Sequence, residues 1–209
     1  KIKMETVSTQ GNLISVEELA SLIFVEGSHT LKTDIPSTLR IIDASMGGDA
    51  ALEGFKEKAI SGASFLNVIK DLKDTNGKYP NTFPPESVVK EALNKLGISK
   101  DDQIIIYGQP GKHPGATRTQ FILSSYGLNV RLLDGGLKKY IEKGYPTQLG
   151  IEYSGGAGSI ESLANPDDHL STIEDIKEFE KGNSDFQLID SRPPKAFNGE
   201  ATDNIEGCC

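Results

Sequence analysis

The chain of 209 residues has few of the side chains that build covalently stapled or metal-stabilised proteins: two cysteines, three histidines and no tryptophan. The cysteines, Cys208 and Cys209, are the last two residues. Adjacent terminal cysteines do not staple a domain, and a cysteine-based zinc site needs ligands spaced along the chain. No two of the histidines, His29, His113 and His169, share a helical face. We therefore expect no disulfide scaffold, no metal site and no cofactor.

Long apolar runs and excess positive charge are lacking as well. No stretch approaches the roughly 18 apolar residues of a membrane-spanning helix. The formal net charge of −8 argues against a nucleic-acid partner, because binding to phosphates requires a basic surface. The content of 36% hydrophobic and 25% charged residues is that of a globular domain. The composition thus excludes nucleic acid and a membrane span.

Short runs of branched apolar residues alternate with helical patterns of about ten residues. The expected strands lie at residues 38–45, 104–107 and 130–133. The expected helices lie at residues 14–23, 86–96, 118–126 and 137–144. Alternation of this kind is typical of βαβ units. We predict an α/β fold with a central parallel sheet and helices on both faces.

Two local signals mark the ends of expected helices. Ser15 precedes Glu17 and Glu18, which is the pattern of a helix N-cap followed by an acidic first turn. Gly97 follows the helix expected at 86–96, at the position where a C-terminal glycine belongs. These signals predict where the first and third elements of the alternation begin and end.

The chain contains an internal repeat with a period of about 150 residues. The helical pattern STIEDIKEFEKG at residues 171–182 repeats ISVEELASLI at 14–23, and FQLIDSRPPKAF at 186–197 repeats LRIIDASMGGDA at 39–50. A stretch rich in Gly, Ser and Asp lies between the copies. We predict a first domain at 12–147, a linker at 148–169, and the truncated beginning of a second domain at 170–209.

Several segments resemble the tandem rhodanese-like sulfurtransferases that act on thiosulfate or 3-mercaptopyruvate. These are LRIIDAS (39–45), KEKAISGASFLNV (56–68), KDTNGKYPNTFPPESVVKEALNKLGISKDDQIIIY (73–107), LDGGLKKYIEKGYP (133–146) and LIDSRPPKAFNGEATDNIEG (188–207). The resemblance implies a rhodanese-like α/β domain followed by the start of a second one. It covers nearly all of the chain outside the linker.

The resemblance also implies sulfur transfer through a cysteine persulfide. A thiolate takes a sulfane sulfur from the donor and passes it to a thiol or cyanide, in a loop whose backbone N–H groups lower the thiol pKa. In tandem members the nucleophile is in the second domain and the first domain's loop is degenerate. The corresponding loop here has no cysteine, and Pro110 and Pro114 each remove an N–H donor. The predicted degenerate loop comprises Gln109, Gly111, Lys112, His113, Gly115, Ala116, Thr117 and Arg118.

The chain departs from the family pattern at several places. Ala59 and Ser61 replace the histidine and proline of a His-Ile-Pro-Gly-Ala motif, and the tryptophans usual near the loop helix are absent. These changes are compatible with the fold. They place the first domain further from a standard member.

Arg192 aligns with an arginine that faces the substrate's anionic group in the family, and its guanidinium suits a two-oxygen partner. The alternative is a structural ion pair at the end of a strand, with Asp190 positioning the next turn. Asp43 and Asp134, at equivalent strand ends, are expected to be structural. No catalytic residue is predicted in the chain.

Other chemistries for the loop find little support. His113 has no nucleophile in a recognisable triad order. Gly115-Ala116-Thr117 is similar to the end of a P-loop, but the lysine is missing and no glycine stands five positions earlier. Arg118 at the start of the following helix would either attract an anion or have a structural or solvated role.

Two functions remain open at this point. One is the N-terminal part of a sulfurtransferase whose nucleophile lies beyond Cys209, with a small anionic sulfur donor as partner. The other is a catalytically inactive rhodanese-like subunit or scaffold in a larger assembly. Because tandem members reside in mitochondria or the cytosol and the sequence begins with Lys1, we expect a processed mitochondrial protein, with the cytoplasm as the alternative.

Overall fold

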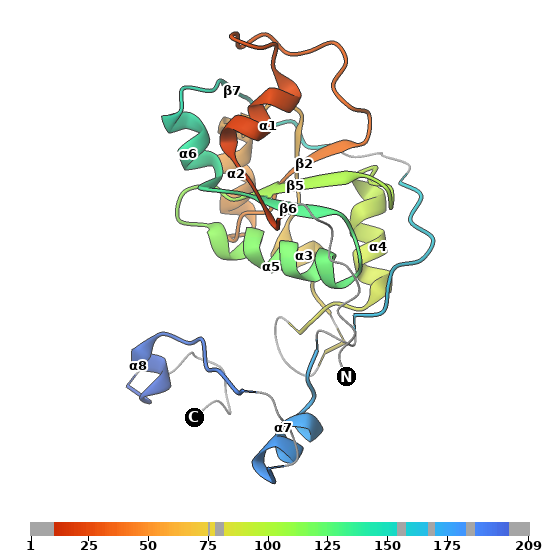
Figure 1. Cartoon of the computed structure of the whole chain (residues 1–209), viewed down its shortest axis with the longest axis vertical. Coiled ribbons are helices and arrows are strands. Elements are labelled where there is room, and N and C mark those ends of the chain that lie inside the picture. Colours follow the sequence, from red (N-terminus) through yellow and green to blue (C-terminus); the bar gives the residue numbers. More distant parts are fainter. Residues whose placement is uncertain are drawn as a thin grey trace. The chain divides into compact units, whose positions relative to one another are not determined.

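The structure is a computed structural model that describes residues 11–74, 76–77, 82–153, 158–166, 170–182 and 187–200. The chain divides into two compact units, Lys1–Pro166 and Asp167–Cys209. The first contains β1 (Leu13–Ile14), α1 (Val16–Ile23), β2 (Leu39–Asp43), α2 (Asp49–Glu57), β3 (Ala59–Ile60), β4 (Ala63–Phe65), α3 (Val68–Asp71), α4 (Glu86–Lys95), β5 (Gln103–Tyr107), α5 (His113–Ser125), β6 (Val130–Leu133), α6 (Gly136–Glu142) and β7 (Thr147–Gln148) (Figure 1). The second contains α7 (Ile173–Glu180) and α8 (Pro194–Phe197).

Five strands form the central sheet in the order β1-β6-β5-β2-β4, and all neighbouring pairs are parallel. β5 lies in the middle, with Ile105 opposite Ile41 of β2 and Arg131 of β6. The three predicted strands correspond to β2, β5 and β6. The predicted α/β fold with a central parallel sheet is therefore confirmed.

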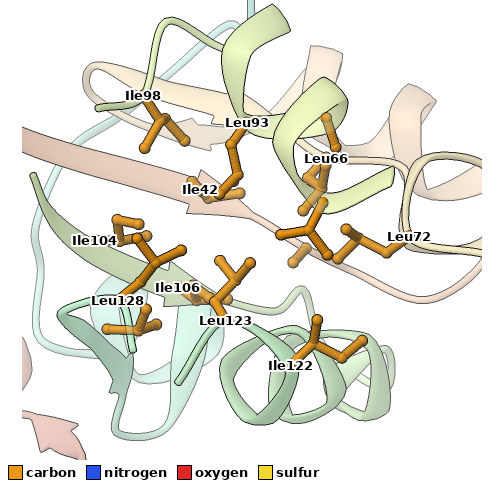
Figure 2. Close-up of a cluster of buried hydrophobic side chains, with 14 of the residues drawn as sticks. Ile42, Leu66, Leu72, Leu93, Ile98, Ile104, Ile106, Ile122, Leu123 and Leu128 are labelled. Atoms are coloured by element: carbon orange, nitrogen blue, oxygen red, sulfur yellow. The ribbon is translucent and has the colours of Figure 1, made fainter. Parts of the chain in front are cut away.

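Side chains of β5 alternate between two apolar cores on opposite faces of the sheet. Ile104 and Ile106 join a core with side chains of α3, α4 and α5, whereas Ile105 and Tyr107 join a core with α1 and α6. Figure 2 shows the first of these cores, in which Leu93 of α4 and Leu123 of α5 point toward the strands that carry Ile42 and Ile106. Because both faces of the sheet are covered, the strands read as unbroken apolar runs in the sequence.

The predicted helix ends are confirmed by their hydrogen bonds. The Glu18 backbone N–H donates to Ser15 Oγ over 3.0 Å, which caps α1. Gly97 follows α4 with a φ of 67°, a conformation that glycine adopts without strain. None of the helices in the described ranges has the length and apolar content needed to cross a membrane.

The segment after β7 runs along the first unit without helix or strand in its described residues. Its backbone is held by hydrogen bonds from Gly150 N to Lys56 O (3.1 Å) and from Ile160 N to Asn94 Oδ1 (3.0 Å). The side chain of Ile160 is buried in the core beside α4 and α5. The described part of the predicted linker thus packs against the first unit.

The second unit differs from the prediction in one element. The helix expected at 171–182 is present as α7, and Thr172 and Asp175 form a reciprocal capping box at its start. The strand expected after Phe186 is absent from the described residues: Leu188 and Ile189 are exposed and unpaired in any sheet. A strand requires a neighbouring strand for its backbone hydrogen bonds, and none is described in this unit. His169, Cys208 and Cys209 lie outside the described residues.

Candidate functional site: the junction of β5 and α5

The junction between β5 and α5 lies at the carboxyl edge of the parallel sheet, where α/β proteins usually bind ligands. β5 ends at Tyr107, and a loop from Gly108 to Lys112 leads into α5. Tyr107 is paired with Asp43, the last residue of β2. The loop predicted to be degenerate therefore stands at the centre of the sheet edge.

The predicted start of the loop helix at Arg118 was wrong, because α5 begins at His113. Pro114 lies in the first turn, where its fixed φ suits a helix and its missing N–H breaks no intrahelical bond. Gly115, Ala116 and Thr117 are consequently helical rather than part of a loop. The true loop is only five residues long.

A buried hydrogen-bond network ties this loop to the end of β2. Asp43 Oδ1 accepts from the Ser45 N–H (3.0 Å) and hydroxyl, and Asp43 Oδ2 accepts from Gln109 Nε2 (2.9 Å). The Gln109 N–H donates to Ser45 Oγ over 2.8 Å. Burial raises the pKa of the Asp43 carboxyl, and the hydrogen bonds from Ser45 and Gln109 oppose that rise. The carboxylate at the end of β2 is thus fully engaged inside the protein.

The remaining polar side chains of the loop turn toward the start of α2. Gln109 Nε2 also donates to Ala51 O (2.8 Å), and Lys112 Nζ donates to Ala50 O (2.7 Å). The Lys112 ammonium lies 3.4 Å from Gln109 Oε1. Main-chain bonding closes the arrangement, since Met46 N donates to Lys112 O over 3.0 Å. The interior of the loop is occupied by the protein's own side chains.

Gly115 brings the first turn of α5 directly against the chain that follows β2. A Cβ at this position would lie 2.3 Å from Ala44 O and 2.6 Å from Met46 N, which are backbone atoms. Only glycine fits such an approach. The amino end of α5 is therefore held on residues 44–46 by backbone contact.

The other residues of the predicted loop lie outside the hydrogen-bond network of Asp43, Ser45 and Gln109. Ala116 is buried in the core, and Thr117 Oγ1 donates to Pro114 O over 3.1 Å. Arg118 donates from its guanidinium to Thr82 O (3.3 Å), and burial lowers its pKa. His113 is exposed beside Gly108. Arg118 thus serves at least one contact within the protein.

Arg192 belongs to the second compact unit. Its Nε lies 2.9 Å and its Nη2 2.7 Å from Asp190 Oδ2, and its backbone N–H donates to Asp190 Oδ1 over 2.9 Å. Asp190 therefore holds the following turn and forms an ion pair with Arg192, although the described residues before it form no strand. The role of Arg192 toward a substrate stays a prediction.

Sequence reasoning missed Ser45, which joins Asp43 to the loop. A signal was present, because an Asp followed two residues later by a backbone N–H donor is typical of an Asx turn. The long-range bond from Gln109 to Ser45 had no local signal, since 64 residues separate the two.

The junction has defined chemical limits. The sequence from Gly108 to Arg118 contains no cysteine. No group of three or more His, Cys, Asp or Glu side chains in the described part of the chain is arranged to hold a metal ion. What the junction offers is a set of donors and acceptors that satisfy one another.

Comparison with known proteins gives the family. The rhodanese-like domain matches residues 29–143. The chain is 32% identical over 173 residues to a thiosulfate sulfurtransferase of Gallus gallus, covering 79% of this chain and 57% of the relative. It is 32% identical over 149 residues to the sulfur carrier protein TtuD of Thermus thermophilus, covering 68% of this chain and 50% of that protein. It thus spans only about half the length of these relatives.

A solved structure gives the same fold. SseA of Escherichia coli, described as a 3-mercaptopyruvate sulfotransferase with the rhodanese fold, superposes with a TM-score of 0.73 at 22% identity, covering 91% of this chain and 69% of that one. The parallel sheet, its flanking helices and the match over more than half of the sequence agree. The chain belongs to the rhodanese-like domain family of sulfurtransferases.

Proposed function

We propose that this chain is the N-terminal part of a tandem sulfurtransferase whose first domain, residues 12–147, is non-catalytic. Residues 148–169 would link it to a second rhodanese-like domain that begins at residue 170. The family match and the sulfurtransferase relatives support the reaction class. The partial coverage of those relatives supports a larger whole protein.

One observation carries the proposal: the junction of β5 and α5 is filled by Gln109 and Lys112 and has no thiol. Sulfur transfer of this class needs a thiolate that attacks the sulfane sulfur of the donor. When the donor is thiosulfate, the donor's S–S bond breaks, sulfite leaves, and a cysteine persulfide forms. The acceptor thiol or cyanide then takes that sulfur and restores the thiolate.

In the proposed complete second domain, Arg192 would face the anionic group of the donor. Its planar guanidinium suits two oxygens at once. In the described structure this fork is turned to Asp190, so that binding a donor would require the guanidinium to exchange partners. We expect a small anionic sulfur donor as the substrate.

A second candidate is a catalytically inactive rhodanese-like subunit or scaffold in a larger assembly. The thiol-free junction favours it, because the same residues that stabilise the first domain leave it without a nucleophile. One relative is named a sulfur carrier protein, which supports sulfur transfer between proteins as the setting. We place the protein in mitochondria, with the cytoplasm as the alternative, which fractionation with compartment markers tests.

The experiment is a thiosulfate:cyanide and 3-mercaptopyruvate:cyanide assay on the natural full-length protein. Turnover that disappears when the cysteine of the second-domain loop is replaced by serine supports the enzyme. Absence of turnover with both donors, in a protein that is folded, contradicts it and supports the inactive subunit.

A matched control separates the two domains. Gln109→Ser places a small hydroxyl in the first-domain loop without adding a thiol, and the proposal expects turnover to change only as far as stability changes. A specific loss of turnover at unchanged stability would contradict a non-catalytic first domain.

A further inference from the structure

We infer that a cavity between α5 and α6, at the carboxyl edge of β5 and β6, binds a small aliphatic carboxylate. The cavity has a volume of about 390 Å³. Sites for small organic ligands range from about 300 to 1,000 Å³, so that its size fits a short-chain molecule. It is lined from three directions: β1, the start of α5, and the turn between β6 and α6.

One wall of the cavity is apolar. Leu13, Leu132, Leu133 and Ala116 line it. Leu13 is 56% exposed, although apolar neighbours surround it. An aliphatic chain placed here would remove this surface from water, at about 25 cal/mol per Å² of apolar area. The wall therefore selects a ligand with a hydrocarbon body.

The opposite wall offers a hydrogen-bonding group. The imidazole of His113 lies against two glycines: a Cβ on Gly108 would be 3.4 Å from His113 Nδ1, and one on Gly136 would be 3.4 Å from His113 Cε1. No polar atom among the described residues hydrogen-bonds this ring. The edge of the imidazole away from the glycines is thus available to an acceptor on a ligand.

The charges at the cavity favour an anion over a cation. The carboxylate that lines it, Asp134, is neutralised by Lys139, whose Nζ lies 2.5 Å from Asp134 Oδ2. Lys138 also lines the cavity, and its nearest carboxylate, Glu142, lies 3.8 Å away in an exposed pair. α5 has no acidic residue in its first turn and no side chain capping it. The whole protein has a net charge of −8, so a cavity whose lining carboxylate is paired and whose lining includes a lysine is a local exception to the negative charge.

The cavity is distinct from the buried network of the junction. Asp43, Ser45 and Gln109 do not line it, whereas His113, Ala116 and Thr117 do. Ligand binding here requires no cysteine and no second domain. Binding of a carboxylate in this cavity is therefore independent of sulfur transfer.

The test uses the 209-residue chain labelled with ¹⁵N, titrated at pH 7 with sodium hexanoate and with hexanamide. Hexanoate is expected to shift the His113 imidazole and the Gly135 and Gly136 amides saturably. Hexanamide has the same body without charge and should bind about tenfold more weakly, the factor that 1.4 kcal/mol of charge interaction supplies. Equal affinity for both, or no saturable binding of hexanoate, would overturn the inference.

Variants locate the binding. His113→Ala and Lys138→Ala should each weaken hexanoate binding by about three- to tenfold, and Thr117→Leu should abolish it by filling the cavity. Lys95→Ala is the matched control, because Lys95 also forms an exposed i,i+4 pair, with Glu91, on a helix far from the cavity lining. Amide spectra report that each variant is folded. If Lys95→Ala weakened hexanoate binding as much as Lys138→Ala, or if the Thr117→Leu variant bound hexanoate as tightly as the unchanged chain, the site would not be this cavity.

Discussion

The two copies of the internal repeat place the same local pattern in different surroundings. In the first copy, Ile42 is 1% exposed within β2 and Asp43 is fully buried. In the second, the matching Ile189 is 78% exposed, and the described residues 187–200 around it form no strand. Yet the turn after each aspartate is the same, because Asp43 Oδ1 accepts from the N–H of Ser45 and Asp190 Oδ1 from that of Arg192.

The comparison separates local from long-range causes. An aspartate turn and a helix cap need only neighbours in sequence, so both copies have them. A buried strand needs partner strands on both sides, and the first copy has them in β4 and β5. Helices show the same contrast: α1 buries four side chains, whereas α7 buries none.

The largest expected difference between the copies lies in their matched isoleucines. Ile42→Ala leaves a cavity between β2 and the helices beneath it, and should lower the free energy of unfolding by about 2–5 kcal/mol. Ile189→Ala should change it by less than about 0.5 kcal/mol, because the side chain is exposed. Urea unfolding followed by circular dichroism measures both. Similar losses in the two variants would contradict the difference in burial.

Removal of the amide that joins the loop to β2 should have the next largest effect. Gln109→Ala leaves Asp43 Oδ2 and Ala51 O without this donor in a buried region, at a cost of about 1–3 kcal/mol. Gln187→Ala, at an exposed glutamine of the second copy, is the control and should be neutral. Thermal unfolding of the two variants compares them. A neutral Gln109→Ala would show that the network does not stabilise the domain.

Helix caps should give a smaller effect. Ser15→Ala removes the acceptor for the Glu18 N–H and should cost about 1 kcal/mol of global stability, since α1 packs into the core. Thr172→Ala removes the corresponding cap of α7 and should lower only the local helix population. Unfolding curves measure the first effect and Cα chemical shifts the second. A global loss of stability from Thr172→Ala would contradict the finding that α7 buries no side chain.

The smallest expected effect is that the two matched aspartates, Asp43 and Asp190, change the stability in opposite directions as the pH rises. Burial raises the pKa of Asp43 above its usual 3.8, so its contribution to stability is present below about pH 4 and lost as the pH rises through the folded-state pKa. The ion pair with Arg192 lowers the pKa of Asp190, so that its contribution is present above pH 4 and lost as the pH falls. Carboxyl ¹³C shifts against pH measure both. A lower pKa for Asp43 than for Asp190 would contradict the burial of Asp43 and the ion pair of Asp190.

Much of the fold could be predicted from sequence. Residues such as Ile104–Tyr107 form an unbroken apolar run, and Ser15 and Gly97 mark helix ends by local chemistry. Two elements could not be predicted correctly in this way. Pro114 was treated as a loop residue although proline also suits a first helical turn. Ile189 follows a strand pattern, but the described part of the second unit contains no partner strand.

The site was predictable in place but not in detail. The strand-to-helix junction and its lack of cysteine are visible in residues 104–118. The bonds from Gln109 to Asp43 and Ala51 connect residues about 60 positions apart and depend on the assembled sheet. Long-range packing of this kind has no period or motif in the sequence.

The most direct measurement for the central claim is thiosulfate:cyanide turnover by the 209-residue chain itself, compared with a Cys208→Ser/Cys209→Ser variant that contains no thiol. If the junction of β5 and α5 is non-catalytic, the two proteins form thiocyanate at the same background rate. Turnover well above background that the variant retains would contradict the account. Retention in the variant would place the activity in the first domain without any cysteine, and loss would place it on the terminal thiols.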